Sequence, residues 1–151
     1  MANETVFKYL AQSTLITAAS SLQVASLNPS TECTSVSSAW HSNYLSADAV
    51  LFASFSTSIS SNSNIVNLYR RDLNIDSTND SPQPTAVSPA YYNTYVGQFQ
   101  IPAFTAASSG YFPLNDIPLC KECQFYIENQ TNSPMISTYT VKFTPKTFGP
   151  L

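Results

Sequence analysis

Two stretches near the C-terminal end of the chain alternate apolar and polar residues, as half-buried β-strands do. They cover residues 124–129 and 138–144, and residues 129–134 between them are rich in turn-forming Asn, Ser and Pro. The apolar side carries Phe125, Ile127, Tyr139, Val141 and Phe143. Tyr126 falls on the polar side. The pattern predicts a β-hairpin within residues 119–148, with those five apolar side chains covered by a second sheet.

Further strand-like segments, separated by turn-rich sequence, occupy most of the remaining chain. They are residues 13–17, 21–27, 49–55, 64–75, 91–102 and 111–119. The run 49–55, AVLFASF, is apolar almost throughout, which predicts a central strand covered on both faces. Gly97 indicates a bulge or a close approach of another segment, and Pro113 and Pro118 predict an edge or bulged strand. About eight short strands favour an all-β fold, an antiparallel β-sandwich or jelly roll.

The first twelve residues differ from the other predicted strands because both of their sides are apolar. The residues concerned are Val6, Phe7, Tyr9 and Leu10. Residues 1–12 therefore form an edge strand of the sheet or an N-terminal arm that reaches onto a neighbouring subunit. Residues 13–151 are expected to form a single β-sandwich domain, since the chain of 151 residues is long enough for one core.

Two long stretches lack any periodic pattern and predict loops. Residues 30–48 are mostly polar and carry Cys33, Trp40 and His41. Residues 76–89 contain three prolines among Asn, Asp and Ser, which predicts a long surface loop. Loops of this length tend to carry contacts with other molecules.

The amino-acid composition limits the kinds of molecule that the chain is expected to bind. Only 10% of the residues are charged, so the surface must consist largely of Ser, Thr, Asn and Gln. Such a surface has little self-repulsion, which suits close contact between subunits. With six Lys and Arg residues and a net charge of −3, the chain is not expected to bind nucleic acid. We also expect no signal peptide and no membrane association, because no apolar run is long enough.

The residues that most resemble a metal or redox site have a plainer explanation. Cys120 and Cys123 form one half of a zinc-ribbon spacing, but a second pair is missing. Oxygen-bearing residues recur at every second position from 72 to 80, without the glycine and distal glutamate of a calcium loop. We therefore expect no metal or other cofactor, and free thiols at the three cysteines.

Catalysis is not indicated either. His41 is the only histidine, and it lies in a polar stretch with no nucleophile motif anywhere in the chain. We expect no enzymatic activity. Tyrosines are the more promising side chains, because Tyr91, Tyr92, Tyr95 and Tyr126 could anchor a protein interface or stack on sugars, although core and cross-strand packing is the favoured explanation for them.

Four segments of the second half resemble small structural proteins of tailed bacteriophage virions. They are NLYRRDLNIDSTNDSPQP at 67–84, TYVGQF at 94–99, FPLNDIPLCKECQFYIEN at 112–129 and VKFTPKTF at 141–148. The resemblance implies a β-sandwich that assembles in several copies, as a capsid decoration or cement protein. A tail or neck component is the alternative within the virion. A carbohydrate-binding module for host recognition is the alternative from another functional class.

The resemblance also implies the partners and the location. The partners are the major capsid protein and further copies of this chain, with a trimer as one form of the homo-oligomer. The location is the virion, assembled in the cytoplasm of the bacterial host. The resemblance supplies no catalytic residues. The interface candidates from the sequence are Val6, Phe7, Tyr9 and Leu10 of the N-terminal segment, together with Tyr91 and Tyr92 at the start of the strand predicted at 91–102.

Overall fold

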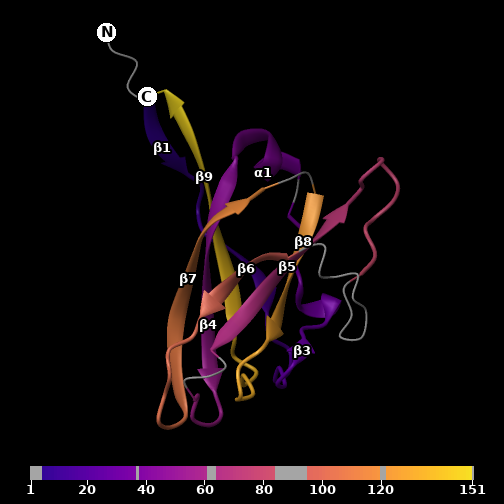
Figure 1. Ribbon diagram of the computed structural model, residues 1–151. Helices are drawn as coiled ribbons and strands as arrows, with labels where there is room; N and C mark the ends of the chain where they lie inside the picture. The colour runs from indigo at the N-terminus through magenta and orange to yellow at the C-terminus, as the bar shows by residue number, and fades with distance from the viewer. Residues whose placement is uncertain (1–4, 37, 61–63, 84–94, 120–121, 151) are drawn as a thin grey trace.

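Two antiparallel sheets pack face to face in the computed structural model, which describes residues 5–36, 38–60, 64–83, 95–119 and 122–150 (Figure 1). The five-stranded sheet has the order β1-β9-β4-β7, and β2 also pairs with β9. Its strands are β1 (Thr5–Tyr9), β2 (Ser13–Thr17), β4 (Ser46–Phe55), β7 (Ser108–Pro118) and β9 (Thr140–Pro150). No helix in these ranges is long and apolar enough to cross a membrane.

The second sheet has four strands in the order β3-β8-β5-β6. They are β3 (Ser26–Leu27), β5 (Ile65–Leu73), β6 (Tyr95–Gln100) and β8 (Glu122–Asn129). The only helical elements in the described ranges are the 3-10 turn η1 (Ser30–Glu32) and α1 (Ser38–Asn43). The prediction of an all-β sandwich is therefore confirmed.

The prediction of a hairpin is wrong, although the residues predicted to face the core do face it. β8 pairs with β3 and β5, whereas β9 pairs with β1, β2 and β4, so the two strands belong to opposite sheets. Their apolar side chains meet across the interior, where the rings of Phe125 and Phe143 stack 4.5 Å apart. All five of the predicted inward residues are fully buried. Alternation fixes which side of a strand faces the core, but it carries no information on which strand lies next to it.

β4 is central, as expected, but only one of its faces is covered. Its inner side chains, among them Ala49, Leu51 and Phe55, are buried, and those between them are partly exposed. The outer positions include Val50 and Phe52. The prediction of a strand covered on both faces is therefore wrong, because the apolar residues of alternate positions form part of an exposed face of the molecule.

Both predicted irregularities of the strands are present. The register between β5 and β6 shifts at Val96, next to Gly97, and a Cβ at Gly97 would lie 3.1 Å from Leu114 Cδ2. Gly97 therefore marks both a bulge and a close approach. β7 is an edge strand whose pairing with β4 shifts between Ala47 and Ala49, opposite Asp116, which has a φ of 58°.

The prediction of a polar loop at residues 30–48 is wrong. It contains η1, α1 and the start of β4, and Trp40 from α1 packs against the core. Glu32 in η1 is buried, where it accepts hydrogen bonds from Ala19 N–H at 2.8 Å and from the Tyr139 hydroxyl. These bonds to distant residues hold the short turn in place, and such contacts leave no periodic signal in the sequence.

Tyr126 is buried, although the alternation placed it on the polar side. It packs with Tyr69 on the outer side of the four-stranded sheet, next to Leu27 and Cys33. Its hydroxyl donates to Gln124 Oε1 at 3.1 Å. A second, smaller apolar cluster therefore lies outside the main core, and Tyr126 does not serve as an exposed stacking residue.

The N-terminal segment takes the edge-strand form. β1 pairs antiparallel with residues 146–150 of β9, and with no other described strand. In Figure 1, β1 and the end of β9 extend together beyond the two packed sheets. The predicted strand at 13–17 matches β2, whereas the one predicted at 21–27 shrinks to the two residues of β3.

Candidate functional site

The outer face of the five-stranded sheet carries several exposed or partly exposed aromatic side chains. Phe52 in β4 lies opposite Tyr111 in β7 and Thr140 in β9. The rings of Phe52 and Tyr111 are 5.0 Å apart, and Tyr111 is 74% exposed. Val50, the neighbouring outer position of β4, is also apolar and partly exposed, so this part of the face presents hydrophobic side chains to solvent, which is the kind of surface that binds other molecules.

The end of the β1–β9 pair continues this face. Tyr9 lies opposite Lys146, and it is 58% exposed; Phe148, two residues further along β9, is 59% exposed. Leu45, just before β4, is 71% exposed. We call the paired segments of β1 and the C-terminal end of β9, residues 5–9 and 146–150, the terminal ribbon.

Phe148 lines two shallow hollows. One, of about 310 Å³, is lined by Lys8, Asn43, Tyr44, Thr147 and Phe148. The other, of about 300 Å³, is lined by Leu45, Ser46, Asp116, Lys146, Thr147 and Phe148. The terminal ribbon therefore offers an exposed aromatic ring that borders two hollows, a shape that can fit against another protein surface.

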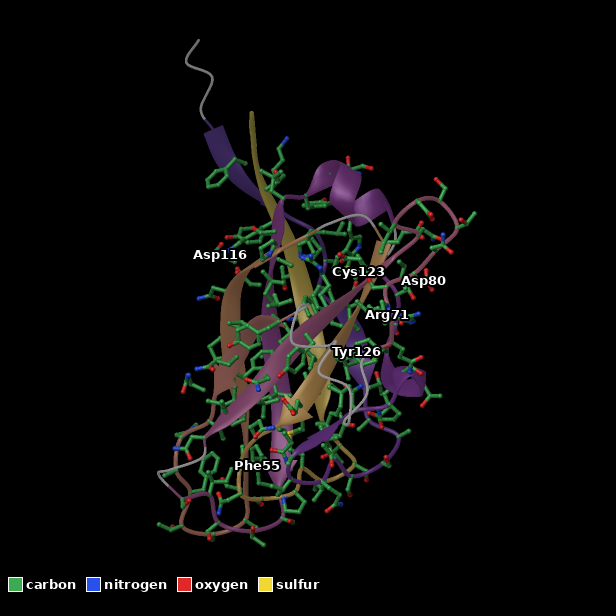
Figure 2. The ribbon with its side chains drawn as sticks, turned by 45° about the vertical axis from the view of Figure 1, so that its right-hand side comes forward. Phe55, Arg71, Asp80, Asp116, Cys123 and Tyr126 are labelled. Atoms are coloured by element: carbon green, nitrogen blue, oxygen red, sulfur yellow. The ribbon has the colours of Figure 1, made fainter. Side chains whose placement is uncertain are left out.

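A lysine and two aspartates on three neighbouring strands form ion pairs that anchor the base of the terminal ribbon. The Lys146 ammonium lies 2.6 Å from Asp48 Oδ1 and 2.6 Å from Asp116 Oδ1. The bulge in β7 gives Asp116 its left-handed backbone, and Asp116 N–H donates to Asp48 Oδ1 at 3.0 Å. Figure 2 shows Asp116 on the side of the molecule away from Arg71 and Asp80. β9, β4 and β7 are thereby tied together where the ribbon leaves the sheet.

The ion pair is stable against pH over the neutral range. Hydrogen bonds to Asp116, and next to Asp48, raise the pKa of the Lys146 ammonium above its ordinary value. A raised pKa of a cation in the folded state stabilises the fold below the ordinary lysine pKa, and the contribution is lost as the pH rises through the raised pKa. The ammonium form of Lys146 that the anchor requires is therefore maintained at neutral pH.

A third hollow lies further along the same face. It encloses about 320 Å³ and is lined by Gln12, Val50, Phe52, Tyr111, Thr140 and Lys142. The two aromatic rings, an amide, a hydroxyl and an ammonium are the mixture that polar ring-shaped ligands such as sugars require. This hollow combines the features that the carbohydrate-binding alternative calls for.

The acidic residues at 72–80 form a turn that is closed by its own hydrogen bonds. Asp76 accepts from Asn79 N–H at 2.8 Å and from Thr78 N–H at 3.2 Å, and Asp80 accepts from Asn74 N–H at 3.0 Å. The bonds from Asn79 and Thr78 lower the pKa of Asp76 to about 2. The carboxylate oxygens of Asp76 and Asp80 thus accept hydrogen bonds from the loop itself. This supports the interpretation of the alternating oxygen-bearing residues as part of a turn. Among the described residues, no group of three His, Cys, Asp or Glu side chains is placed to hold a metal ion.

The thiols are placed for packing. Neither Cys33 nor Cys123 takes part in a disulfide bond, and Cys123 is buried in the core. Burial, opposed in part by a hydrogen bond from Asn28, raises the pKa of Cys33 to about 11. Its reactive thiolate form is therefore scarce at neutral pH. Cys120 lies outside the described residues, and His41 is in α1, far along the chain from either cysteine of the C-x2-C pair.

The six interface candidates from the sequence divide into three groups. Tyr9 is exposed on the terminal ribbon, and Leu10 is exposed directly after it. Val6 and Phe7 belong to β1, where the register places Phe7 opposite Phe148, and their side chains are outside the described set. Tyr91 and Tyr92 fall outside the described residues altogether. The sequence prediction missed Leu45, Phe52, Tyr111 and Phe148, and the unbroken apolar run AVLFASF was the one signal that pointed to Phe52.

Comparison with protein-family models, with curated proteins and with solved structures finds no match for this chain.

Proposed function

We propose that this chain is a structural subunit of a tailed-phage virion, and that it decorates or cements the capsid shell through contacts with shell subunits and with further copies of itself. The four segments at 67–84, 94–99, 112–129 and 141–148 that resemble virion proteins are the starting point. The proposal needs no reaction and no cofactor, because the work of such a subunit is to hold neighbouring subunits in place.

The terminal ribbon is the structural feature that most strongly supports the proposal. A two-stranded ribbon is marginally stable in water by itself, so one that extends from a domain gains stability when another surface covers it. Here it bears Tyr9 and Phe148, both more than half exposed, and it is anchored to the domain by Lys146. Aromatic side chains on a rigid support are well suited to anchor a protein interface.

The charge of the surface supports the same function. With 10% charged residues, the chain has few charged groups, which are the most costly to remove from water when subunits come together. Each contact can be weak, since many copies bound to one shell act together. A surface of this kind suits permanent assembly better than the capture of a charged ligand from solution.

A second candidate function is recognition of host carbohydrate, and the hollow at Phe52 and Tyr111 favours it. Its aromatic rings could stack on a sugar ring, while Gln12 and Lys142 could bind hydroxyl or acidic groups. The two functions differ in the number of copies required. A recognition module is needed only at the few sites where a particle touches its host, whereas a decoration protein covers the shell.

Removal of residues 1–10 tests the proposal and the role of the ribbon together. We expect the intact chain to copurify with virions, and the truncated chain to fold but to be absent from them. The fold should persist because β1 pairs with β9 only, among the described strands, and extends beyond the region where the two sheets pack on each other. Immunoblots of gradient-purified particles give the occupancy, and far-UV circular dichroism of the purified proteins reports the fold.

The outcomes separate the two claims. Absence of the intact chain from washed virions would overturn the virion proposal. Occupancy by the truncated chain equal to that of the intact chain would leave the virion proposal standing and would show that the ribbon is not the contact.

A further inference from the structure

We propose that two copies of this chain pair through their β1 strands, antiparallel about a two-fold axis, so that two five-stranded sheets join into one continuous sheet. This inference rests on the proposed function in treating the chain as an assembly subunit. Its test requires only purified protein, so that it can fail while the virion proposal stands. The partner is a second copy of this chain, and the bonds that form are main-chain hydrogen bonds between the two strands.

The first observation is the direction of the main-chain groups of β1. Leu10 N–H donates to Pro145 C=O at 2.9 Å, and the register pairs Lys8 with Thr147. Since hydrogen bonding alternates along an antiparallel pair, Lys8 turns its N–H and C=O toward β9, and Phe7 turns its own away from it. β1 ends the sheet, so this outward side is a pairing edge that no described strand occupies.

The second observation is that the two edges of the sheet differ. The opposite edge strand, β7, contains Pro113 and Pro118 and is bulged at Asp116. Prolines and bulges are the devices by which proteins prevent unwanted pairing at a sheet edge. β1, with the sequence TVFKY, has neither. The fold thus protects one edge and leaves the other able to accept a strand.

The third observation is that the sequence of β1 suits pairing with itself. An antiparallel pair centred on Phe7 places Phe7 opposite Phe7 of the second copy, Thr5 opposite Tyr9, and Val6 opposite Lys8. The only charged residue of the strand therefore faces an apolar one. In a parallel, in-register pair, Lys8 would face Lys8, and like charges directly opposite each other are destabilising. The lysine thereby selects the two-fold arrangement, which closes after two copies.

The surroundings of the edge supply the apolar contact that a strand pair needs in addition to its hydrogen bonds. Phe148 lies opposite Phe7 in the adjacent strand, and Tyr9 and Leu10 are exposed at the end of β1. Pairing two ribbons gives a four-stranded assembly, and three or more strands are the number at which a sheet with an apolar face becomes stable in water. Both ribbons are stabilised by the same contact.

A cysteine at position 7 tests the arrangement directly. Phe7→Cys places two thiols opposite each other in a hydrogen-bonded pair, where Cα atoms lie about 5.5 Å apart, within the range for a disulfide. We expect oxidation of Phe7→Cys to give a covalent dimer on non-reducing gels. Lys8→Cys is the matched control, because position 8 faces position 6 of the other copy, and the unsubstituted chain controls for its native cysteines.

Proline supplies the second variant. Phe7→Pro removes the N–H that points to the second copy and retains the N–H groups that bond to β9, whereas Phe7→Ala removes the same side chain and keeps the donor. In sedimentation velocity we expect dimers for the unsubstituted chain and for Phe7→Ala, and monomers for Phe7→Pro. An unsubstituted chain that stays monomeric at every concentration, open-ended polymers, or equal cross-linking through positions 7 and 8 would each overturn the pairing.

Discussion

Replacing Phe143 with alanine will lower the free energy of unfolding by about 3–5 kcal/mol, the range for removal of a fully buried phenylalanine ring. Phe143 is completely buried in β9 and stacks on Phe125 of β8 at 4.5 Å. These two rings connect the sheets, so the cavity left by the substitution lies between the layers, where neighbouring strands cannot collapse into it. Urea unfolding followed by tryptophan fluorescence or circular dichroism measures the loss.

Tyr111→Ala is the control for that experiment, since it also removes a large ring from a strand of the same sheet. Tyr111 is mostly exposed on the outer face, and its substitution should change the free energy of unfolding by no more than about 1 kcal/mol. Equal losses for Phe143→Ala and Tyr111→Ala would contradict the assignment of inner and outer faces.

Asn129→Ala will lower the free energy of unfolding by about 2–4 kcal/mol, because it removes the hydrogen bonds of a buried amide and leaves the Thr131 N–H without the acceptor it has in the folded chain. The Asn129 amide donates to Ser133 C=O at 2.9 Å and to Leu22 C=O at 3.3 Å. Its carbonyl accepts from the Thr131 hydroxyl at 2.7 Å and from Thr131 N–H at 3.1 Å. One side chain thus forms hydrogen bonds with buried groups within and next to the segment that links β8 to β9.

Asn132→Ala is the matched control within the same segment. Asn132 is exposed, and its carbonyl accepts from Ser60 N–H at 3.1 Å. Water can replace that bond, so we expect a change within about 0.5 kcal/mol. Asn129→Asp should resemble Asn129→Ala, since a carboxylate cannot donate to the two carbonyls. Full stability of Asn129→Asp would show that the network does not depend on those donors. The same denaturant titrations provide all three values.

The network around Asn129 also explains why the hairpin prediction failed. Residues 129–134 have the composition of a tight turn, and a tight turn between two alternating segments predicts direct pairing. In the folded chain those residues are held by long-range contacts, such as Ser133 Oγ with Thr57 Oγ1 at 2.9 Å. They guide the chain from one sheet to the other. A bond between residues so far apart in sequence leaves no local pattern.

Inward-facing residues were predictable because burial on one face imposes a period of two on the sequence itself. Gly97, Pro113 and Pro118 were informative for a similar reason, since their backbone properties restrict where they can lie in a sheet. Strand partners and the short helix α1 were not predictable. Both depend on which distant segments pack together, and Trp40 of α1 is fixed by the core and not by a helical repeat.

The candidate site was predictable in part. The doubly apolar N-terminal segment marked Tyr9 and Leu10, because an edge strand with two apolar sides calls for a partner. Phe148 and Leu45 were missed, since single apolar residues at strand ends look the same whether they are buried or exposed. Whether Phe52 faces the core or solvent depended on whether β4 is covered on one face or on both, which only the three-dimensional structure shows.

The number of copies per virion tests the central proposal most directly. Quantitative mass spectrometry of purified particles, with isotope-labelled peptides of this chain and of the major shell protein as standards, gives the ratio of the two. A decoration or cement subunit predicts copies in numbers comparable to those of the shell protein. A handful of copies per particle would contradict that role and favour host recognition, and complete absence would contradict a place in the virion.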